Sequence, residues 1–310
     1  MKILLSIPKN QIDLRLDQVV SNLVETCSRK QAADLISSGE VQVSGMKKRP
    51  GYRVKQEDII TARIPEPVEE VPPGPEAMDL SILFEDDHIL VIDKPPGMVV
   101  HPGAGNLSGT LVNGLLDYFP FFNDEAWPPL RPGIVHRLDK DTSGLILVAK
   151  NLESLGFLQR EFKQRRVEKR YLALVEGVGI ADEGEIILPL GRHPVKRKMM
   201  AVNHETGKYA KTTWRVMERF AKGCLIDVRL HTGRTHQIRV HVRAMDMPLF
   251  GDKVYQYRKN RRKKNDFADR QMLHSWRLRF RHPYSGREIK FETKIPTDFP
   301  GTMAKLGLPG

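Results

Sequence analysis

Cysteine is scarce in this chain, and long apolar runs are absent from it. The 310 residues contain two cysteines, Cys27 and Cys224, which are far apart and form no C-x-x-C pair. This argues against a thiolate zinc site and against a disulfide framework, and it fits a reducing cytoplasm. The apolar run at the N-terminus ends at Pro8, and no stretch approaches the roughly 20 residues that cross a bilayer. We therefore expect a soluble, cytoplasmic protein without a membrane segment.

Three ligand-binding motifs are incomplete. The glycine-bearing run 101–110, HPGAGNLSGT, lacks the Gly-Lys-Ser/Thr ending of a Walker loop. The segment from Asp139 resembles the opening of an EF-hand loop, but Lys150 occupies the twelfth position, where calcium requires a glutamate. Three histidines lie five residues apart within 231–241, which is the wrong spacing for one helix face. The sequence therefore predicts neither nucleotide-triphosphate binding nor a metal site.

Acidic residues are outnumbered by basic ones. The chain has 50 Lys and Arg against 38 Asp and Glu, which gives a formal net charge of +12. Such an excess suits a polyanionic partner such as nucleic acid. The densest basic run is YRKNRRKKN at 257–265. It is either a solvated charged loop or a loop that contacts phosphates.

The composition divides the chain into two domains and a linker. Residues 1–64 are expected to form a small unit, with an apolar helical pattern over 14–24 and a second helix from Ser28 to Gly39. Strands are expected at 41–43 and 59–60. Residues 65–78 contain five prolines, four glutamates and no basic residue, so they read as an extended acidic linker. Residues 79–310 are expected to form the second, larger domain.

The long domain is predicted to be α+β, with a largely antiparallel mixed β-sheet flanked by helices and loops. Its pattern mixes many apolar or alternating runs with a few helical ones. Strands are expected at 88–93, 145–149, 171–176, 224–230, 273–280 and 288–295. Helices are expected near 110–117, 153–165 and 235–245.

The segment VHRLDKDTSGLILVAK, residues 135–150, places Asp139 between Arg137 and Lys140 just before a buried strand. A loop at the mouth of a sheet is a usual place for a catalytic side chain. Taken alone, the segment is explained at least as well by an Asx-type turn, in which Asp139 or Asp141 bonds to nearby amides.

The segment LHTGRTHQIRVHV, residues 230–242, predicts a helix with Thr235 as its N-cap. The apolar stripe of that helix is expected to consist of Ile238, Val242 and Met245. Arg239 lies on an adjoining face. If it points inward it needs a carboxylate partner, because a buried unpaired guanidinium is very costly. Asp139 would meet that need and would in turn be held ionised.

Together these segments resemble the RluA-type pseudouridine synthases. The likeness covers nearly the whole chain, and its strongest elements are residues 84–105, 133–150 and 231–242. The resemblance implies an isomerase that converts uridine to pseudouridine without a cofactor or metal. It assigns catalysis to Asp139, with Tyr171 of the strand EKRYLALVEG and Arg239 as active-site partners. It also implies that Arg137 helps to hold the target nucleotide out of its helix.

The N-terminal unit resembles an S4 domain, a small RNA-binding module. Its expected phosphate contacts are Arg15, Arg29, Lys30, Lys47, Lys48 and Arg49. The likeness of the whole chain to the RluA-type family implies a structured stem-loop of large-subunit ribosomal RNA as the partner, and we expect a monomer. Two competing functions are a non-catalytic RNA-binding protein and a glycosidase-like hydrolase. The hydrolase needs two carboxylates about 5 Å apart, for which Asp141 is the local candidate.

Overall fold

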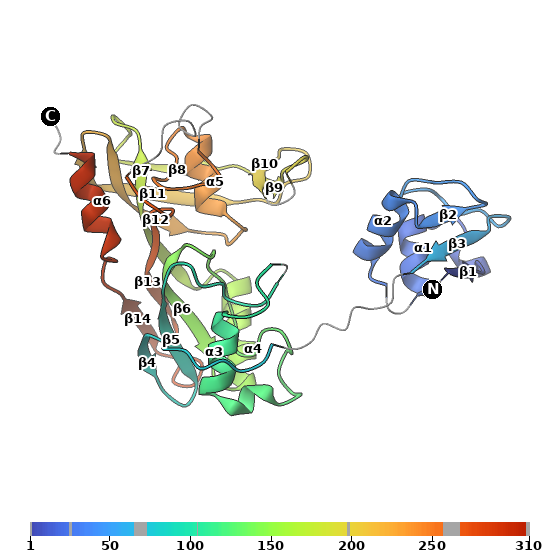
Figure 1. Cartoon of the computed structure of the whole chain (residues 1–310), viewed down its shortest axis with the longest axis horizontal. Helices are drawn as coiled ribbons and strands as arrows, with labels where there is room; N and C mark the ends of the chain where they lie inside the picture. The colour runs from blue at the N-terminus through green and yellow to red at the C-terminus, as the bar shows by residue number, and fades with distance from the viewer. Residues whose placement is uncertain are drawn as a thin grey trace. The chain divides into compact units, whose positions relative to one another are not determined.

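The chain folds into two compact units, residues 1–71 and 72–310, and each has its own hydrophobic core (Figure 1). The computed structural model describes residues 2–24, 27–64, 73–103, 105–196, 199–256 and 267–307. The basic run 257–265 and most of the acidic stretch, residues 65–72, therefore lie outside the described residues.

The N-terminal unit packs two helices against a three-stranded antiparallel sheet in the order β1-β3-β2. Ser28 caps the second helix through a capping box with Gln31, and Gly39 ends it in the left-handed conformation. Both predicted ends of that helix are confirmed. The elements are β1 (Lys2–Leu5), η1 (Lys9–Gln11), α1 (Leu16–Leu23), α2 (Arg29–Ser38), β2 (Val41–Val43) and β3 (Ile60–Arg63).

The C-terminal unit is built on a nine-stranded sheet. Of its strand pairs, β6 with β13 is parallel and the others are antiparallel, which confirms the predicted α+β class. In spatial order the strands are β4 (Ile82–Glu85), β5 (Ile89–Lys94), β6 (Ser143–Ala149), β13 (Leu273–Arg281), β7 (Glu168–Glu176), β12 (Gly223–Leu230), β11 (Lys211–Phe220) and β8 (Glu183–Ile187), with β14 (Glu288–Glu292) beside β13. A separate hairpin joins β9 (Leu190–Arg192) to β10 (Met200–Val202).

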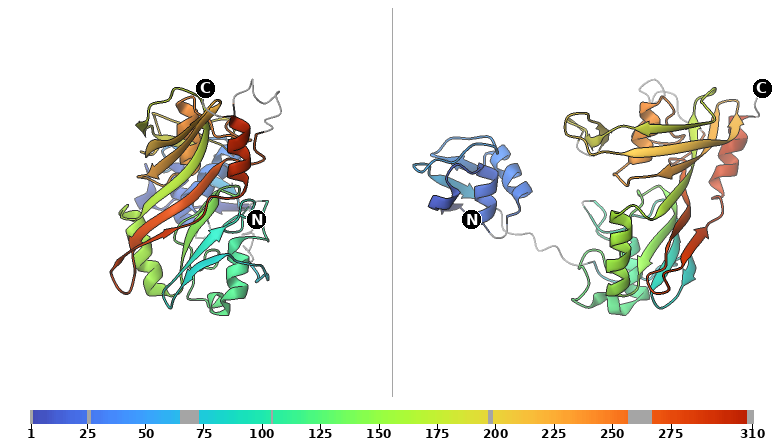
Figure 2. Two further views of the ribbon diagram at one scale, coloured as in Figure 1. Left: turned by 90° about the vertical axis from the view of Figure 1, so that its left-hand side faces the viewer. Right: turned by 180° about the vertical axis from the view of Figure 1, so that it is seen from behind.

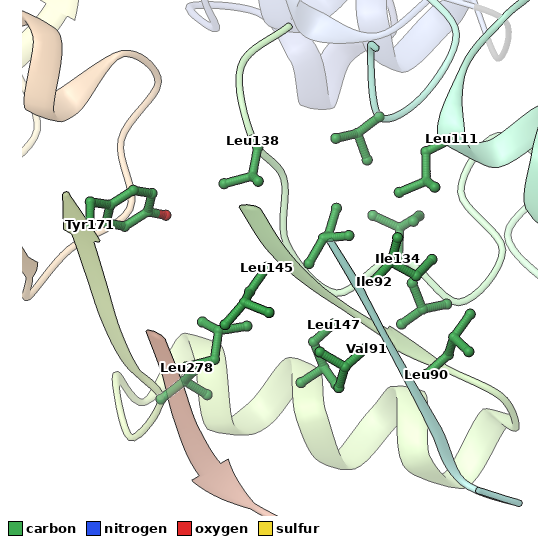
Figure 3. Packing of buried hydrophobic residues seen from close by; sticks show 14 of the residues in the cluster. Leu90, Val91, Ile92, Leu111, Ile134, Leu138, Leu145, Leu147, Tyr171 and Leu278 are labelled. Carbon is green, nitrogen blue, oxygen red and sulfur yellow. The ribbon is translucent and has the colours of Figure 1, made fainter. Parts of the chain in front are cut away.

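Helices cover both faces of this sheet (Figure 2). On one side lie α3 (Leu111–Tyr118), α4 (Leu152–Lys163) and α5 (Gln237–Ala244), and on the other lies α6 (Asp298–Leu306). Strand β7 shows why both faces are apolar, since Tyr171 and Ala173 belong to the main core while Leu172 and Leu174 pack with α6. Figure 3 shows Tyr171 at one end of the main core, on the side of Leu138 and Leu145 and away from Leu90 and Ile92 of β5. A 3-10 turn, η2 (Pro120–Asn123), follows α3.

The last part of the acidic stretch packs on α3. The Asn113 side chain donates a hydrogen bond to the carbonyl oxygen of Gly74 at 2.7 Å, and the Glu76 amide donates to the Asn113 carbonyl at 3.0 Å. The Met78 side chain lies against Gly114, so closely that a side chain there would displace it. Residues 73–78 therefore belong structurally to the C-terminal unit.

The start of α5 differs from the prediction. Its N-cap is His236, in the left-handed conformation at φ 56°, and Thr235 does not cap it. The Gln237 side chain accepts hydrogen bonds from the Thr232 hydroxyl and the Arg234 amide, so the preceding loop wraps around Gln237. The predicted stripe is also wrong at Met245, which is 46% exposed, whereas its other two members are buried.

Candidate active site

A cavity of about 470 Å³ opens in the C-terminal unit where the loop before β6, the start of β7 and the start of α5 meet. This volume lies within the range of ordinary ligand sites. All four residues of the C-terminal unit that the sequence singles out line the cavity: Arg137, Asp139, Tyr171 and Arg239. The fold thus brings together residues that are up to 102 positions apart, as the difference between 239 and 137 shows.

A buried lysine holds the loop that carries Asp139 through hydrogen bonds to its backbone. Lys94 is fully buried, and its ammonium donates to three backbone carbonyl oxygens, among them that of Lys140 at 3.2 Å. Burial lowers the pKa of Lys94 to about 7, although the nearby carboxylates Asp141 and Asp139 oppose this shift. The Thr142 amide also donates to the Asp139 carbonyl at 3.1 Å, which closes the turn. These bonds fix the backbone on both sides of the carboxylate.

Arg239 bridges two carboxylates. Its Nη1 lies 3.1 Å from Asp139 Oδ2, so the predicted ion pair is present. Its Nε and Nη2 donate to Asp252 at 2.7 and 2.9 Å, which is a bidentate pair. Burial acts to lower the pKa of Arg239, but the bonds and charges of Asp252 and Asp139 outweigh it and raise the pKa. The guanidinium is therefore permanently charged beside Asp139, whose side chain is 18% exposed.

A histidine lines the wall next to Asp139, and a buried tyrosine contacts that histidine. The Tyr255 hydroxyl accepts a hydrogen bond from the Met200 amide at 2.9 Å and lies 2.7 Å from His236 Nδ1. In a neutral imidazole one ring nitrogen carries the proton, and the tautomer decides whether Tyr255 or His236 donates this bond. Nε2 lies 3.9 Å from Asp139 Oδ2. Burial lowers the pKa of His236, against the charge of Asp139, which favours this neutral form.

Tyr171 forms the apolar floor of the cavity. Its side chain is 5% exposed and belongs to the main core, as Figure 3 shows. Burial raises the pKa of Tyr171, while a hydrogen bond with Ser275 acts in the opposite direction. The phenol is therefore neutral and suited to contact rather than to proton transfer. The predicted strand EKRYLALVEG is confirmed as β7.

Arg137 lies at the rim between two cavities. Its side chain is exposed, and it lines both the main cavity and a neighbouring one of about 430 Å³ that also contains His101 and Asn106. Asp139 and Arg239 line both cavities as well. The catalytic candidates thus stand on a shared wall, accessible from two sides.

The three histidines with a spacing of five are engaged with the protein rather than gathered at one point. His231 pairs with the Thr213 hydroxyl, His236 with Tyr255, and His241 with the Thr212 hydroxyl. In the described ranges no group of three histidine, cysteine, aspartate or glutamate side chains could hold a metal ion. Nor does any helix in the described part of the chain have both the length and the apolar character to cross a membrane.

In the N-terminal unit, basic side chains surround the start of α1. Arg15 and Arg29 share the buried carboxylate of Asp17 at 2.9 and 3.7 Å. The Asp17 amide donates to the Pro50 carbonyl, which brings the loop that carries Arg49 to the same place. Lys48 lies over the ring of Tyr52, 5.2 Å from its centre. Lys30 and Lys47 are exposed.

Comparisons with known proteins agree with this arrangement of sheet and site. The family model for RNA pseudouridylate synthase matches residues 88–244, and the model for the S4 domain matches residues 14–60. The first match contains the loop of Asp139, strand β7 and helix α5. The fold and the site thus define an RNA-modifying isomerase that carries an RNA-binding module.

Individual relatives give a more specific comparison than the family models do. "Ribosomal large subunit pseudouridine synthase D" of Nitrosomonas europaea is 42% identical over 97% of this chain and 87% of that protein. An uncharacterized RNA pseudouridine synthase of Bacillus subtilis is 40% identical over 96% of this chain and 97% of its own length. The solved structure "Human RNA Pseudouridylate Synthase Domain Containing 1" has a TM-score of 0.58 and 29% identity, over 73% of this chain and 87% of that chain. The chain belongs to the RNA pseudouridylate synthase family.

Sequence reasoning misses Asp252, Tyr255 and Lys94. Asp252 lies in a turn, where its Oδ1 also accepts from the Val254 and Tyr255 amides, and no spacing rule connects it to α5. A signal was present, however. Burying Arg239 beside the partly exposed carboxylate of Asp139 calls for a second, better buried counter-charge.

Proposed function

We propose that this chain isomerises uridines to pseudouridine in a stem-loop of large-subunit ribosomal RNA, with Asp139 as the carboxylate that acts on the target nucleoside. The observation that carries the proposal is the contact of 3.1 Å between Asp139 and the buried Arg239 on the wall of the cavity. The names of the relatives support this class of RNA. The basic excess of the chain and the match to the S4 domain support an RNA partner.

The reaction needs a fixed negative charge at one point. It breaks the N1–C1′ bond of uridine, turns the base, and joins C5 to C1′, with no net redox change. Positive character develops at the sugar carbon as the glycosidic bond breaks. A carboxylate there can stabilise that charge, attack C1′ or take a sugar proton. The hydrogen bond from Arg239 holds the Asp139 carboxylate in one position for any of these roles.

The target base must leave its helix to reach Asp139. Flipping costs a few kcal/mol, which contacts in the cavity offset in part. Tyr171 offers an apolar ring in the floor of the cavity, against which the flipped uracil packs. Arg137 stands exposed at the rim, where its guanidinium fills the vacated space or holds a phosphate.

The N-terminal unit contributes affinity. The basic residues around the start of α1 would contact phosphates of the same RNA. Linking two RNA-binding surfaces through one chain raises the effective concentration of the second contact. Chemistry is assigned to the C-terminal unit alone.

The test is Asp139→Asn with Asp141→Asn as its matched control. The substitutions are isosteric, and both sites lie on the same loop. We expect Asp139→Asn to lower pseudouridine formation in transcribed large-subunit RNA by about 10³-fold or more, with the Kd for that RNA within about threefold of the parent. Asp141→Asn should retain activity. Full activity of Asp139→Asn would remove the central assignment.

The hydrolase alternative has a distinct signature. A retaining hydrolase needs both carboxylates and releases free base. Equal loss of activity in the two variants, together with free uracil in the reaction mixture, would favour hydrolysis over isomerisation.

A further inference from the structure

The cavity wall carries many more positive than negative charges. Asp139 is the one carboxylate among the residues that line it. The cations that line it are Arg137, Lys163, Arg165, Lys169, Arg234 and Arg239. Arg239 is neutralised by its two carboxylates. Within the described ranges no ion pair involves Lys163, Arg165, Lys169 or Arg234, so no paired carboxylate offsets the positive charge of these four side chains.

Arg165 is placed there against the preference of the backbone. It follows α4 with φ 60°, in the left-handed position where glycine is favoured. The bonds Arg166 N–H to Glu161 O and Arg165 N–H to Phe162 O complete a Schellman motif around it. A bulky residue in this conformation costs roughly 1–2 kcal/mol. Strain of this kind is found where a side chain must be presented in one direction.

An exposed aromatic ring lies beside Arg165. Tyr209 is 49% exposed, and the guanidinium carbon of Arg165 lies 5.8 Å from its ring centre. Arg234 Nε donates to the Tyr209 carbonyl at 3.2 Å, so the same strand end is held by a second cation. Tyr209 lines a further cavity of about 330 Å³, which shares Arg165 and Leu230 with the main cavity. The two hollows are therefore contiguous.

Lys169 lines the same cavity as Arg165 and Asp139. Its ammonium lies 5.5 Å from the centre of the Phe162 ring, on the wall of the main cavity. Burial, and then the charge of Arg165, lower the pKa of Lys169 to about 8. A neighbouring anion would oppose both effects and raise the pKa of Lys169. The charge of this lysine is thus incompletely compensated until an anion arrives.

We propose that Arg165, Lys169 and Arg234 hold the phosphate adjoining the target uridine, and that the Tyr209 ring stacks on the next base. This inference rests on the proposed function, since it extends the same RNA out of the cavity. A flipped nucleotide drags its flanking phosphate towards the protein, where guanidinium groups bind it in bidentate fashion. Stacking on Tyr209 is indifferent to base identity, because every base has a π-face.

The first measurement is RNA affinity and turnover with transcribed large-subunit RNA. The second is the Kd of a fluorescein-labelled oligouridylate between about 0.05 and 0.3 M KCl, because phosphate contacts weaken over this range of salt. The variants are Arg165→Asn, Arg165→Gly and Arg234→Gln. Asparagine and glycine both accept the left-handed conformation, so the fold is kept while the charge is lost. We expect KM to rise about tenfold with kcat within about twofold. The slope of log Kd against log salt should fall by about 0.7 for each contact removed.

Tyr209 provides an independent arm. Tyr209→Ala should weaken oligouridylate binding about tenfold without changing the salt slope, and Tyr209→Phe should restore it. The control is Arg287→Asn, an exposed cation in the turn after β13. Arg287→Asn should change neither the affinity for oligouridylate nor the salt slope.

Two results would overturn this inference while leaving the proposed function intact. One is an unchanged KM and salt slope in the Arg165 and Arg234 variants of an enzyme that still forms pseudouridine. The other is a loss of affinity that tracks a thermal midpoint more than about 2 °C below the parent, since that identifies a folding defect. If the parent forms no pseudouridine at all, the proposed function fails, whereas the salt slopes still report on the phosphate site.

Discussion

Arg239 lies between two carboxylates that differ in burial. The Asp252 side chain is 1% exposed, while that of Asp139 is 18% exposed. The buried partner takes two of the guanidinium nitrogens and leaves Nη1 for the partner in the cavity. Asp252 therefore positions Arg239, and through it Asp139, without reaching the cavity itself.

This arrangement predicts the behaviour of Asp252→Asn. Removing a charge from a buried pair leaves an incompletely compensated guanidinium, so we expect about 3 kcal/mol lower stability and a fall in kcat with little change in KM. Urea unfolding and steady-state kinetics measure the two effects.

The matched control is Asp227→Asn. Asp227 pairs with Arg170 at 2.8 Å outside the cavity, and its side chain is 10% exposed. It should lose stability and keep kcat. A normal kcat in Asp252→Asn would show that Arg239 needs no such support.

At the scale of single residues, the sequence predicts the ion pair of Arg239 with Asp139 and does not predict the second partner of Arg239, Asp252. A guanidinium on the inner side of a helix requires a carboxylate, and Asp139 satisfies that rule. The same rule does not locate Asp252, whose place depends on the turn before Tyr255. The roles of Tyr171 and Arg137 remain predictions, although both line the cavity.

Among the elements, the parallel contact between β6 and β13 fixes the loop of Asp139 to the sheet. Residue 144 must be glycine there, because its φ is 108° and a side chain would collide with the backbone of Ser275. One register step away, His274 Nδ1 lies 2.9 Å from the Ser143 hydroxyl. His274 is 1% exposed, and burial lowers its pKa to about 4.

The buried imidazole predicts loss of stability in acid. The folded pKa of His274, about 4, is below the unfolded value of about 6.5, so the unfolded chain binds the extra proton between these values. Stability is full above pH 6.5 and falls as the pH drops towards 4. Between pH 7.5 and pH 5, His274 is expected to lower the free energy of unfolding by about 2 kcal/mol.

Urea unfolding of the parent and of His274→Asn at both pH values checks this. On acidification, the free energy of unfolding of the variant should fall by about 2 kcal/mol less than that of the parent. The exposed His204→Asn should behave as the parent. Equal losses in all three proteins would mean that His274 is protonated in the fold.

Element prediction succeeds where local chemistry decides. The capping residues Ser28 and Gly39 place α2, and the runs of apolar residues place β5, β6, β7, β12 and β13. It fails where distant contacts decide, as at Thr235, where Gln237 bonds to β11 and the loop instead of leaving the cap to threonine. Strands β8 to β11 and helix α6 are not predicted, and β11 also carries a bulge between Val216 and Glu218 that breaks its alternation.

Over the whole molecule, the two units predict separable contributions to RNA binding. A chain without residues 1–64 should fold, keep kcat at saturating RNA, and bind large-subunit RNA about tenfold or more weakly, because the second contact is lost. Filter binding and kinetics measure both. Unchanged affinity would argue against the proposed role of the N-terminal unit.

The packing of residues 73–78 on α3 decides where these units can be cut. Removal of residues 1–72 leaves the bonds of Asn113 to Gly74 and Glu76 intact. Removal of residues 1–78 strips them and uncovers Gly114 as well. A chimera that uses this isomerase domain must therefore include residues 73–78, and recombination that joins a foreign module directly to β4 would yield a destabilised enzyme.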